Sequence, residues 1–482
     1  MTTPVATLAA RLSEALPPRA IVTDRASIAP WENDWRGRWH GRADLMLEPA
    51  SAQEVQAIVR AAADLRVPLV PQGGNTSMVG GATPPDNGSA AIVSLRRMNR
   101  VRALDPAAGQ AVAEAGVILS DLHAAALAQG MRFPLSLGAK GSATVGGLVS
   151  TNAGGTQVLR FGTMRGLVLG LEAVLPDGSL HGGLAALRKD NRGYDLTQLL
   201  IGAEGTIGIV TAATLRLVPA AVSRAVGWAG VASPADALAL LRRFQRANEA
   251  VESFELMPAS SIAAVVAHVA GARAPLPGDH AWQVLVEVTA SSAGDPDPAA
   301  VIEQVLSAAA GDGLVVDATI AASEAQADAF WRLRESISAA EKALGPAAQH
   351  DISVPVEDMP RFMIEAAAAC DARFPGTSAS GYGHLGDGNV HFHVRAAPGT
   401  DPAHWYAEQV HAVSAFVHDL VAAAGGSISA EHGIGVMKRD ELARLSSPAR
   451  MAALRGVKAG LDPLGLMNPG KLIALAPAPA TE

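Results

Sequence analysis

The first clear pattern of apolar and polar positions along the chain lies in residues 43–70. ADLMLEP has the short apolar run of a buried strand, and EVQAIVRAAADLR repeats apolar residues at helical spacing. Ser51 precedes this helix and Glu54 follows three residues later, which is the arrangement of a capping box. VPLVP predicts a second strand, so we expect a parallel β–α–β unit here.

Beyond this unit the pattern divides the chain into a part rich in strands and a part rich in helices. Up to residue 219 the apolar runs are short and separated by glycines, as in AAIVSL and GTIGIVTAATLRLVP. From residue 220 longer Ala- and Leu-rich helical patterns appear, with strand-like pieces such as NVHFHV between them. The sequence therefore predicts an α+β protein with domains at 1–219 and 220–445, and a C-terminal segment, 446–482, that returns to the first domain.

Composition and charge exclude several functions. The 482 residues carry 38 basic and 46 acidic side chains, and the net charge of -8 argues against nucleic-acid binding. The one cysteine, Cys370, rules out disulfides within the chain and thiolate metal clusters, and it favours a reducing cytoplasm. We recognise no signal peptide and no run of about 18 apolar residues, so we expect a cytoplasmic protein, with peripheral membrane contact left open.

Glycine is the informative excess, because many of the 48 glycines are clustered. The first cluster, PQGGNTSMVGG at 71–81, follows a predicted strand and fits either an anion-binding loop or a surface loop. Further clusters lie at 136–155 and 201–211. None matches GxGxxG or GxxxxGK[ST], so we expect neither a nicotinamide site nor an NTPase. Loops of this kind in one domain favour the enclosure of a single large cofactor.

The stretch GYGHLGDGNVHFHV at 381–394 brings histidines close together. NVHFHV alternates, so His391 and His393 face one side of a strand while the apolar residues face the core. LGDGN predicts a turn that returns His384 towards His391, and ISAEHGIG supplies Glu431 further along. Two imidazoles and a carboxylate form a common catalytic metal arrangement. Histidines held in a polar pocket, and a surface pair of Glu431 and His432, are the alternatives that these residues leave open.

Further motifs accompany the glycine clusters in a fixed order. After PQGGNT, LGAKGSATVGGLVSTNAGG, FGTMRG, GYDL and IGAEGTIGIVT come WRLRESIS, HDISVPV, GHLGDGNVHFHV, AEHGIG and LDPLGLMNPGK. Across residues 35–472 this set resembles the FAD-linked D-2-hydroxyacid dehydrogenases, the group that holds D-lactate and D-2-hydroxyglutarate dehydrogenases. The resemblance implies a two-part FAD-binding domain of the vanillyl-alcohol-oxidase type and an α+β substrate, or cap, domain. It also implies hydride transfer from a D-2-hydroxy acid to FAD.

The resemblance assigns FAD to the glycine-rich loops of the first domain, with the pyrophosphate on the PQGGNT loop. Some relatives attach FAD through a histidine, but none lies in residues 71–81 or 136–166, so we expect non-covalent FAD. The residues implied to contact it are Pro71, Gly73, Gly74, Asn75, Thr76, Gly80, Gly81, Gly141, Ser142, Gly146, Asn152, Gly154, Glu204, Gly205, Ile209 and Asn468.

By the same resemblance, His384, His391 and Glu431 hold a divalent metal, which we expect to be zinc. The metal would bind the substrate's carboxylate and 2-hydroxyl and lower the pKa of that hydroxyl. His432 would take the hydroxyl proton as general base, because an imidazole has a suitable pKa near neutrality.

Four further residues are expected to line the substrate pocket together with His432. Arg334 in WRLRESIS matches a family arginine that holds a substrate carboxylate, and Ser338 follows it at the i, i+4 spacing of one helix face. Relatives that oxidise 2-hydroxyglutarate tend to carry lysine where this chain has Gln349, and asparagine where it has His393. Glutamine supplies no cation for a distal carboxylate, so D-2-hydroxyglutarate, D-lactate and other D-2-hydroxy acids all stay open as substrates.

Other functions compete with a dehydrogenase. A flavin oxidase of the same fold would pass electrons to O2 and release peroxide. A zinc hydrolase would leave the glycine-rich loops unexplained, and a non-catalytic flavin subunit would not need intact EHG and GHLGDGNVH motifs. For the dehydrogenase we expect an electron acceptor such as an electron-transfer flavoprotein or a quinone and no nucleic-acid partner, and we leave formation of a homodimer open.

Overall fold

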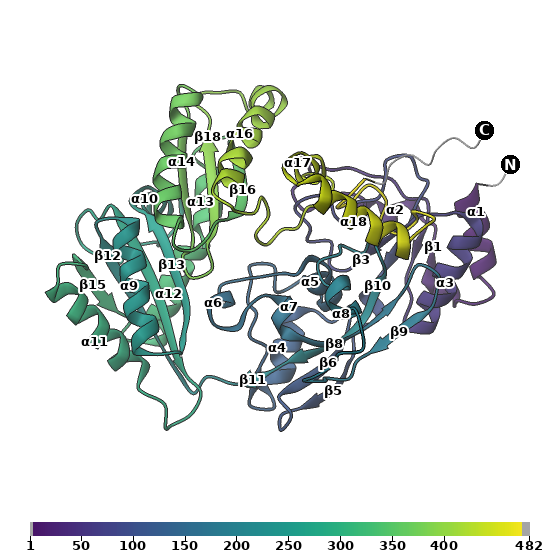
Figure 1. Cartoon of the computed structure of the whole chain (residues 1–482), viewed down its shortest axis with the longest axis horizontal. Helices are drawn as coiled ribbons and strands as arrows, with labels where there is room; N and C mark the ends of the chain where they lie inside the picture. Colours follow the sequence, from purple (N-terminus) through teal and green to yellow (C-terminus); the bar gives the residue numbers. More distant parts are fainter. Residues whose placement is uncertain (1–2, 475–482) are drawn as a thin grey trace. The chain divides into compact units, whose positions relative to one another are not determined.

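The computed structural model describes residues 3–474. The chain divides into two compact units: unit 1 comprises Met1–Gly154, Thr163–Pro219 and Glu431–Glu482, and unit 2 comprises Gly155–Gly162 and Ala220–Ala430 (Figure 1). Residues 431–445, which the sequence pattern grouped with the second domain, therefore belong to unit 1. Residues 475–482 of the expected C-terminal segment lie outside the described residues.

The strands of unit 1 form sheets of four, five and two strands. Their bounds are β1 (Ile21–Val22), β2 (Met46–Leu47), β3 (Leu69–Gln72), β4 (Ala91–Ser94), β5 (Val101–Asp105), β6 (Gln110–Glu114), β7 (Met131–Arg132), β8 (Val168–Val174), β9 (Leu180–Gly183), β10 (Ile209–Arg216) and β11 (Val218–Pro219). The strand orders are β1-β2-β4-β3, β5-β6-β10-β8-β9 and β11-β7. Because β2 and β3 each pair in parallel with β4, the predicted β–α–β unit forms with β4 between its two strands.

The helices of unit 1 alternate with these strands along the chain, and two more helices follow the return of the chain to unit 1. They are α1 (Pro4–Leu12), η1 (Pro18–Ala20), α2 (Arg25–Ile28), η2 (Ala29–Trp31), α3 (Ala52–Leu65), η3 (Leu95–Arg97), α4 (Leu119–Leu127), α5 (Val145–Thr151), α7 (Met164–Leu167), α8 (Leu196–Leu200), α17 (Arg439–Leu445) and α18 (Pro448–Leu461).

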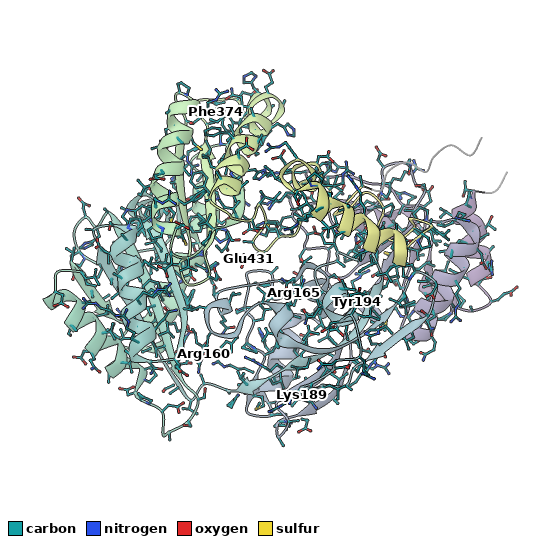
Figure 2. All side chains as sticks on the ribbon, in the orientation of Figure 1. Arg160, Arg165, Lys189, Tyr194, Phe374 and Glu431 are labelled. Carbon is teal, nitrogen blue, oxygen red and sulfur yellow. The ribbon has the colours of Figure 1, made fainter. Side chains whose placement is uncertain are left out.

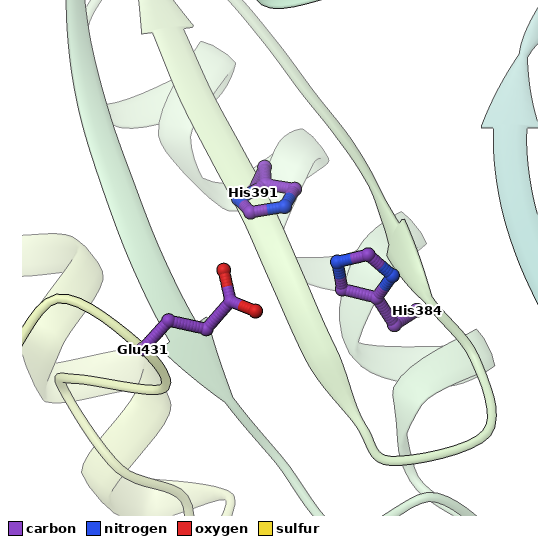
Figure 3. Close-up of side chains that lie close together, drawn as sticks. All are labelled: His384, His391 and Glu431. Carbon is purple, nitrogen blue, oxygen red and sulfur yellow. The ribbon is translucent and has the colours of Figure 1, made fainter. Parts of the chain in front are cut away.

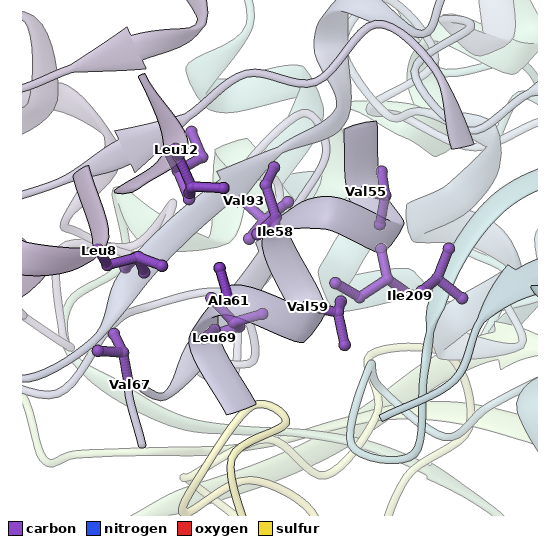
Figure 4. Packing of buried hydrophobic residues seen from close by; sticks show 14 of the residues in the cluster. Leu8, Leu12, Val55, Ile58, Val59, Ala61, Val67, Leu69, Val93 and Ile209 are labelled. Carbon is purple, nitrogen blue, oxygen red and sulfur yellow. The ribbon is translucent and has the colours of Figure 1, made fainter. Parts of the chain in front are cut away.

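Helix α3 begins where the sequence predicts. The hydroxyl of Ser51 accepts the N–H of Glu54 at 3.2 Å, and the Glu54 carboxylate accepts the N–H of Ala50 at 2.7 Å. The apolar face of α3 packs against α1 and the parallel strands, and Figure 4 shows this cluster of buried residues. Each fully buried aliphatic side chain contributes roughly 1.5–3 kcal/mol, so this cluster fixes the strand from which the first glycine-rich loop leaves.

Unit 2 is built on one seven-stranded sheet with the order β15-β12-β14-β13-β17-β18-β16. Its strands are β12 (Ser223–Val231), β13 (Val251–Pro258), β14 (Trp282–Ala290), β15 (Asp317–Ile320), β16 (Ala347–Ser353), β17 (Ser378–His384) and β18 (Asn389–Arg395). Its helices are α6 (Val158–Phe161), α9 (Pro234–Ala247), α10 (Ala259–His268), α11 (Pro298–Gly311), α12 (Glu324–Glu335), α13 (Ile337–Lys342), α14 (Met359–Arg373), α15 (Pro402–His404), η4 (Trp405–Gln409) and α16 (Val410–Ala423).

The two faces of the unit 2 sheet are covered by different helices. On one face, Phe244 of α9 packs edge-on against Phe254 of β13, and Phe362 of α14 packs against Phe392 of β18. On the other face, α10, α12 and α13 share a buried cluster with residues such as Trp228 and Tyr382. Within residues 3–474, no helix has the length and hydropathy that crossing a membrane would require.

Candidate functional site

The glycine-rich loops of unit 1 pack directly on one another. A Cβ atom on Gly73 would lie 2.1 Å from Oγ1 of Thr144, and one on Gly74 would lie 1.8 Å from the carbonyl oxygen of Ser142. Gly205 has a φ of +69°, and a Cβ there would lie 3.1 Å from Pro71. The sequence left an anion-binding loop and a surface loop open as reasons for these glycines. The structure shows a different reason at Gly73 and Gly74, where any side chain would clash with the neighbouring loop.

Asparagines hold the turns of these loops in left-handed conformations. Asn75 has a φ of 52° and its amide donates to the carbonyl of Asn33 at 2.9 Å. Asn152 has a φ of 50° and accepts the backbone N–H of Arg165 at 2.9 Å. The Arg165 guanidinium, labelled in Figure 2, donates in turn to the carbonyl of Ile201 at 2.8 Å. Asparagine tolerates this conformation better than most other non-glycine residues. Because Arg165 contacts both Asn152 and Ile201, it joins the second glycine-rich loop to the third.

Several buried polar atoms beside these loops lack a hydrogen-bond partner among the described residues. They are Oγ1 of Thr144, Oε1 of Gln72 and Oδ1 of Asn468. An unsatisfied buried polar atom costs about 1–3 kcal/mol, so these atoms leave room for polar partners that the protein itself does not supply. A Cβ on Gly141 would meet no atom within 4 Å. Both observations fit a cofactor with polar groups at these loops.

The remaining residues assigned to FAD by the resemblance also lie in unit 1. Ile209 begins β10, is fully buried, and belongs to the apolar core of Figure 4. Gly146 packs on Ala115, since a Cβ there would lie 2.7 Å from the methyl group of that alanine. The others in or beside the loops are Thr76, Gly80, Gly81, Ser142 and Gly154.

Glu204 is a buried carboxylate that holds the loop of the EHG motif. It accepts the N–H of Ile434 at 2.6 Å and the N–H of Gly435 at 2.7 Å, one on each oxygen. Asn468 donates to the carbonyl of Glu204 at 2.7 Å and to that of Gly81 at 2.9 Å. Burial raises the pKa of Glu204 above its ordinary value, although the two amide groups act in the opposite direction. The resemblance gave Glu204 to FAD, and its carboxylate here serves the C-terminal segment.

In unit 2, the alternation predicted for NVHFHV is confirmed. Val390, Phe392 and Val394 of β18 are fully buried on one face of the sheet. His391 and His393 lie on the other face, where their rings lie 5.0 Å and 5.7 Å from the Tyr382 ring. The face that carries the histidines is therefore the one covered by α12 and α13.

His384 joins this face at the end of β17. Glycine at 388 has a φ of +81°, and the turn that the sequence predicted connects β17 to β18. The His384 and His391 rings are 5.5 Å apart at an interplanar angle of 78°. Nδ1 of His384 lies 2.6 Å from Oε1 of Glu255, the residue paired with it in the neighbouring strand β13.

Arg334 reaches the same buried carboxylate from α12. Its Nε donates to Oε2 of Glu255 at 2.7 Å, and its guanidinium carbon lies 5.0 Å from the centre of the Tyr382 ring. Burial alone would raise the pKa of Glu255, but the charges of Arg334 and His384 offset it and hold that pKa below its ordinary value. Glu255 was not predicted from the sequence, where its one signal is a glutamate inside the apolar run SFELMP.

Ser338 does not share a continuous helix with Arg334. The stretch predicted as one helix is two, because α12 ends at Glu335 and α13 begins at Ile337, with Ser336 between them. Ser338 is exposed, whereas Arg334 is buried. The i, i+4 relation expected from the sequence is therefore lost at this junction.

The two positions at which the resemblance suggests a departure from 2-hydroxyglutarate-oxidising enzymes lie opposite one another. Gln349 of β16 pairs with His393 of β18. His393 is buried, and its Nδ1 forms a short hydrogen bond with Glu341 of α13. His350 bonds the carbonyl of Phe392 and the hydroxyl of Ser414, both at 3.0 Å. Both ring nitrogens of His350 are thus engaged within the protein, so it cannot replace the absent lysine.

Glu431 is the residue at which the chain passes from unit 2 to unit 1. The preceding residue, Ala430, donates its N–H to the carbonyl of Asp351 in β16 at 3.3 Å. Ligand atoms of His384, His391 and Glu431 lie within 4.8 Å of one another (Figure 3). Asp351, Glu431 and His432 form a second set by the same criterion. Two imidazoles and a carboxylate suit a divalent metal such as zinc, so the donor set fits the expected ion.

Comparisons with known proteins now decide the family. Residues 43–182 match an FAD binding domain, and residues 221–472 match the C-terminal domain of FAD linked oxidases. The mitochondrial D-2-hydroxyglutarate dehydrogenase of Arabidopsis thaliana is 36% identical over 461 residues, which cover 95% of this chain and 80% of that protein. The chain belongs to the FAD-linked D-2-hydroxyacid dehydrogenase family.

Two further comparisons extend this result. The D-2-hydroxyglutarate dehydrogenase of Xanthomonas citri pv. viticola is 36% identical over 468 residues, covering 97% of both chains. The solved structure of p-cresol methylhydroxylase with substrate bound aligns with a TM-score of 0.75 at 14% identity, covering 98% of this chain and 97% of that one. The expected two-part FAD-binding fold of the vanillyl-alcohol-oxidase type is thereby confirmed.

The expectation of a cytoplasmic location is wrong by the same comparisons. The Arabidopsis relative is named a mitochondrial enzyme, at the same identity as the bacterial one. The inference rested on a single cysteine and on finding no signal peptide or long apolar run, and none of these features distinguishes one reducing compartment from another.

Proposed function

We propose that this chain is an FAD-dependent dehydrogenase that oxidises a D-2-hydroxy acid to the corresponding 2-oxo acid. The relatives are named D-2-hydroxyglutarate dehydrogenases, and the family match supplies the FAD-binding domain. The observation that carries the proposal is the buried face of unit 2, where Arg334 and His391 lie against Tyr382 and His384 lies beside His391. A cation and metal-binding imidazoles on one face can bind a carboxylate next to a hydroxyl group. A flavin oxidase is not favoured by these relatives.

The protein's own residues would bind and orient the substrate. Bound FAD supplies the two-electron acceptor for the hydride from C2. Arg334 binds the substrate carboxylate through its planar guanidinium, and His432 takes the proton of the 2-hydroxyl. The Ile434 and Gly435 amides fixed by Glu204 hold the loop on which His432 stands.

His384, His391 and Glu431 are the proposed ligands of a divalent metal, expected to be zinc. Such an ion would act as a Lewis acid at the substrate oxygens. The imidazoles and the carboxylate in Figure 3 support this proposal. The metal content of the purified protein, compared with that of His391→Ala, tests it directly: loss of the bound metal supports the ligand set.

A substrate panel tests the function as a whole. The purified yellow protein is mixed with a dye acceptor and with D- and L-2-hydroxy acids that carry or lack a distal carboxylate. We expect flavin bleaching by D-acids alone, and activity only on L-acids would overturn the proposal. His432→Ala should keep FAD and metal but oxidise substrate about 10²–10⁴-fold more slowly, the usual contribution of a general base.

Whether the substrate carries a distal carboxylate can be tested by one substitution at Gln349. The relatives are named for a dicarboxylic substrate, yet Gln349 supplies no cation and His350 is engaged within the sheet. Gln349→Lys should raise kcat/KM for D-2-hydroxyglutarate about tenfold or more and leave D-lactate unchanged, because hydrogen bonds to charged groups contribute about 1.5–3 kcal/mol. Gln349→Met, of similar size, is the matched control. An equal rise in kcat/KM for both substrates would show that residue 349 does not contact the distal carboxylate of D-2-hydroxyglutarate.

The attachment of FAD, the electron acceptor and the oligomeric state can each be tested separately. We propose that FAD is bound without a covalent link, so that acid precipitation should release it into the supernatant. Electrons leave to an acceptor such as an electron-transfer flavoprotein or a quinone, and absence of peroxide during turnover would support this over O2. Sedimentation of the holoenzyme tests whether a homodimer forms.

A further inference from the structure

Glu255 is a fully buried carboxylate that no part of the expected chemistry requires. It lies on β13 among apolar neighbours, and each of its oxygens serves a different functional residue: Oε1 lies 2.6 Å from Nδ1 of His384, and Oε2 accepts Nε–H of Arg334 at 2.7 Å. We propose that Glu255 is a positioning residue that couples the metal-binding imidazole to the arginine that anchors the substrate. This inference rests on the proposed function.

The contact with His384 determines which ring nitrogen can bind a metal. A carboxylate only accepts hydrogen bonds, so Nδ1 of His384 carries the hydrogen in this contact and donates it. The lone pair then resides on Nε2, the nitrogen left for the metal. Metal-binding histidines commonly donate their other ring N–H to a carboxylate, which fixes the ring and raises its basicity. The direct pairing of Glu255 with His384 across β13 and β17 holds this geometry in the sheet itself.

The contact with Arg334 fixes the guanidinium group through the other oxygen of the same carboxylate. Arg334 comes from α12, outside the sheet, and is buried over the Tyr382 ring. The bond to Nε uses one edge of the guanidinium and sets the plane of the group. A shift of Glu255 would therefore move the metal ligand and the carboxylate anchor together, so that the substrate's two oxygen-binding sites keep a fixed separation.

The same strand offers a matched comparison. Glu252 of β13 is also fully buried and also pairs with an arginine, because it accepts from Arg160, which is labelled in Figure 2, at 2.8 Å and from the hydroxyl of Thr289 at 2.7 Å. Gln157 also donates to it, at 3.2 Å, and none of these three partners carries an imidazole. A purely structural role for buried glutamates on β13 would make Glu252 and Glu255 equivalent, whereas the proposed coupling makes only Glu255 affect metal binding.

The experiment compares Glu255→Gln, Glu255→Asp and Glu252→Gln with the wild-type holoenzyme. Zinc affinity is measured by competition with a chromogenic chelator, and KM and FAD content are measured on the same samples. Both Glu255 variants should bind zinc about 10–100-fold more weakly and show a raised KM. Aspartate keeps the charge but is one methylene too short to reach both partners. Glu252→Gln should keep the wild-type zinc affinity, and all three variants should keep their FAD.

The outcomes separate this inference from the proposed function. His384→Ala is included as a reference: if it keeps the wild-type zinc affinity, the proposed metal site itself is wrong. If His384→Ala loses zinc while both Glu255 variants keep zinc affinity and KM within twofold, only the coupling is overturned. If Glu255→Gln is insoluble, Glu255→Asp decides. An insoluble Glu255→Asp would also count against the proposal, because a variant that keeps the buried charge should fold.

Discussion

Glu204 in unit 1 and Glu255 in unit 2 are both buried carboxylates, and they differ in what surrounds them. Glu204 accepts two backbone N–H groups, and burial raises its pKa. At Glu255, burial acts in the same direction, but the charges of Arg334 and His384 offset it and lower the pKa. At Glu204 the two amides, together with the charges of Lys438 and Lys471, do not compensate burial, whereas at Glu255 the direct ion pair with Arg334 and the contact with His384 do.

The difference separates two uses of a buried carboxylate in one protein. Glu204 binds the backbone amides of the loop that begins with Glu431 and His432, so its role is to fix the position of that loop. Glu255 holds charged side chains, so its own charge is part of the site. Substitutions at the two places should therefore differ in the size of their effect and in the property that they change.

The largest effect should come from removing the cation beside Glu255. Arg334→Met leaves a buried carboxylate without its ion-pair partner, which typically destabilises a protein by about 3–5 kcal/mol. Urea unfolding followed by circular dichroism measures the loss. Arg332→Met is the control, because Arg332 is exposed on the same helix and should change stability by less than about 0.5 kcal/mol. Equal stabilities of the two variants would show that Glu255 does not depend on Arg334.

Lys471 is a buried cation whose charge interacts with that of Glu204. Burial, together with the charge of Arg439, lowers the pKa of Lys471 to about 8, while Glu204 acts in the opposite direction. Between about pH 8 and 10.5 the unfolded chain therefore binds more protons than the folded one, and wild-type stability rises relative to Lys471→Met. Below pH 8 the methionine variant should be more stable by up to about 3 kcal/mol.

Thermal unfolding at pH 7 and pH 10 tests this, with Lys189→Met at an exposed position as the control. The difference between Lys471→Met and the wild type should shrink at the higher pH, and the control should show no such change. A difference that is the same at both pH values would mean that Lys471 is not the titrating group.

The sequence predicted the elements better than the connections between them. The alternation in β18 and the cap at Ser51 depend on neighbours within a few residues, so local pattern was sufficient. Glu255 was missed because its partner His384 lies 129 residues away, and only the pairing of β13 with β17 brings them together. The break at Ser336 was missed because the apolar spacing continues through it. Motif resemblance supplied Glu204 as a residue of interest but not its contact with Ile434.

Glu204→Gln should have a moderate effect of a different kind. The amide can accept one backbone N–H, but its NH2 group would face the other, leaving a buried donor unsatisfied at a cost of about 1–3 kcal/mol. Hydrogen exchange of residues 431–437 should become faster, because the bonds to Ile434 and Gly435 hold that loop. Glu48→Gln is the control, since Glu48 pairs with Arg96 near the surface. Unchanged exchange in the loop would remove the geometric role given to Glu204.

The smallest effect should appear at Glu341, a third buried carboxylate that combines both kinds of partner. It bonds His393 and accepts the hydroxyl of Ser261 at 2.9 Å, and its pKa is lowered because these contacts offset burial. Ser261→Ala removes a neutral donor and leaves the imidazole, so we expect a loss of about 0.5–1.5 kcal/mol in unfolding free energy. The exposed neighbour Ser260→Ala is the control. A loss as large as that of Arg334→Met would mean that a neutral donor can match a charged one, and the distinction drawn between Glu204 and Glu255 would no longer hold.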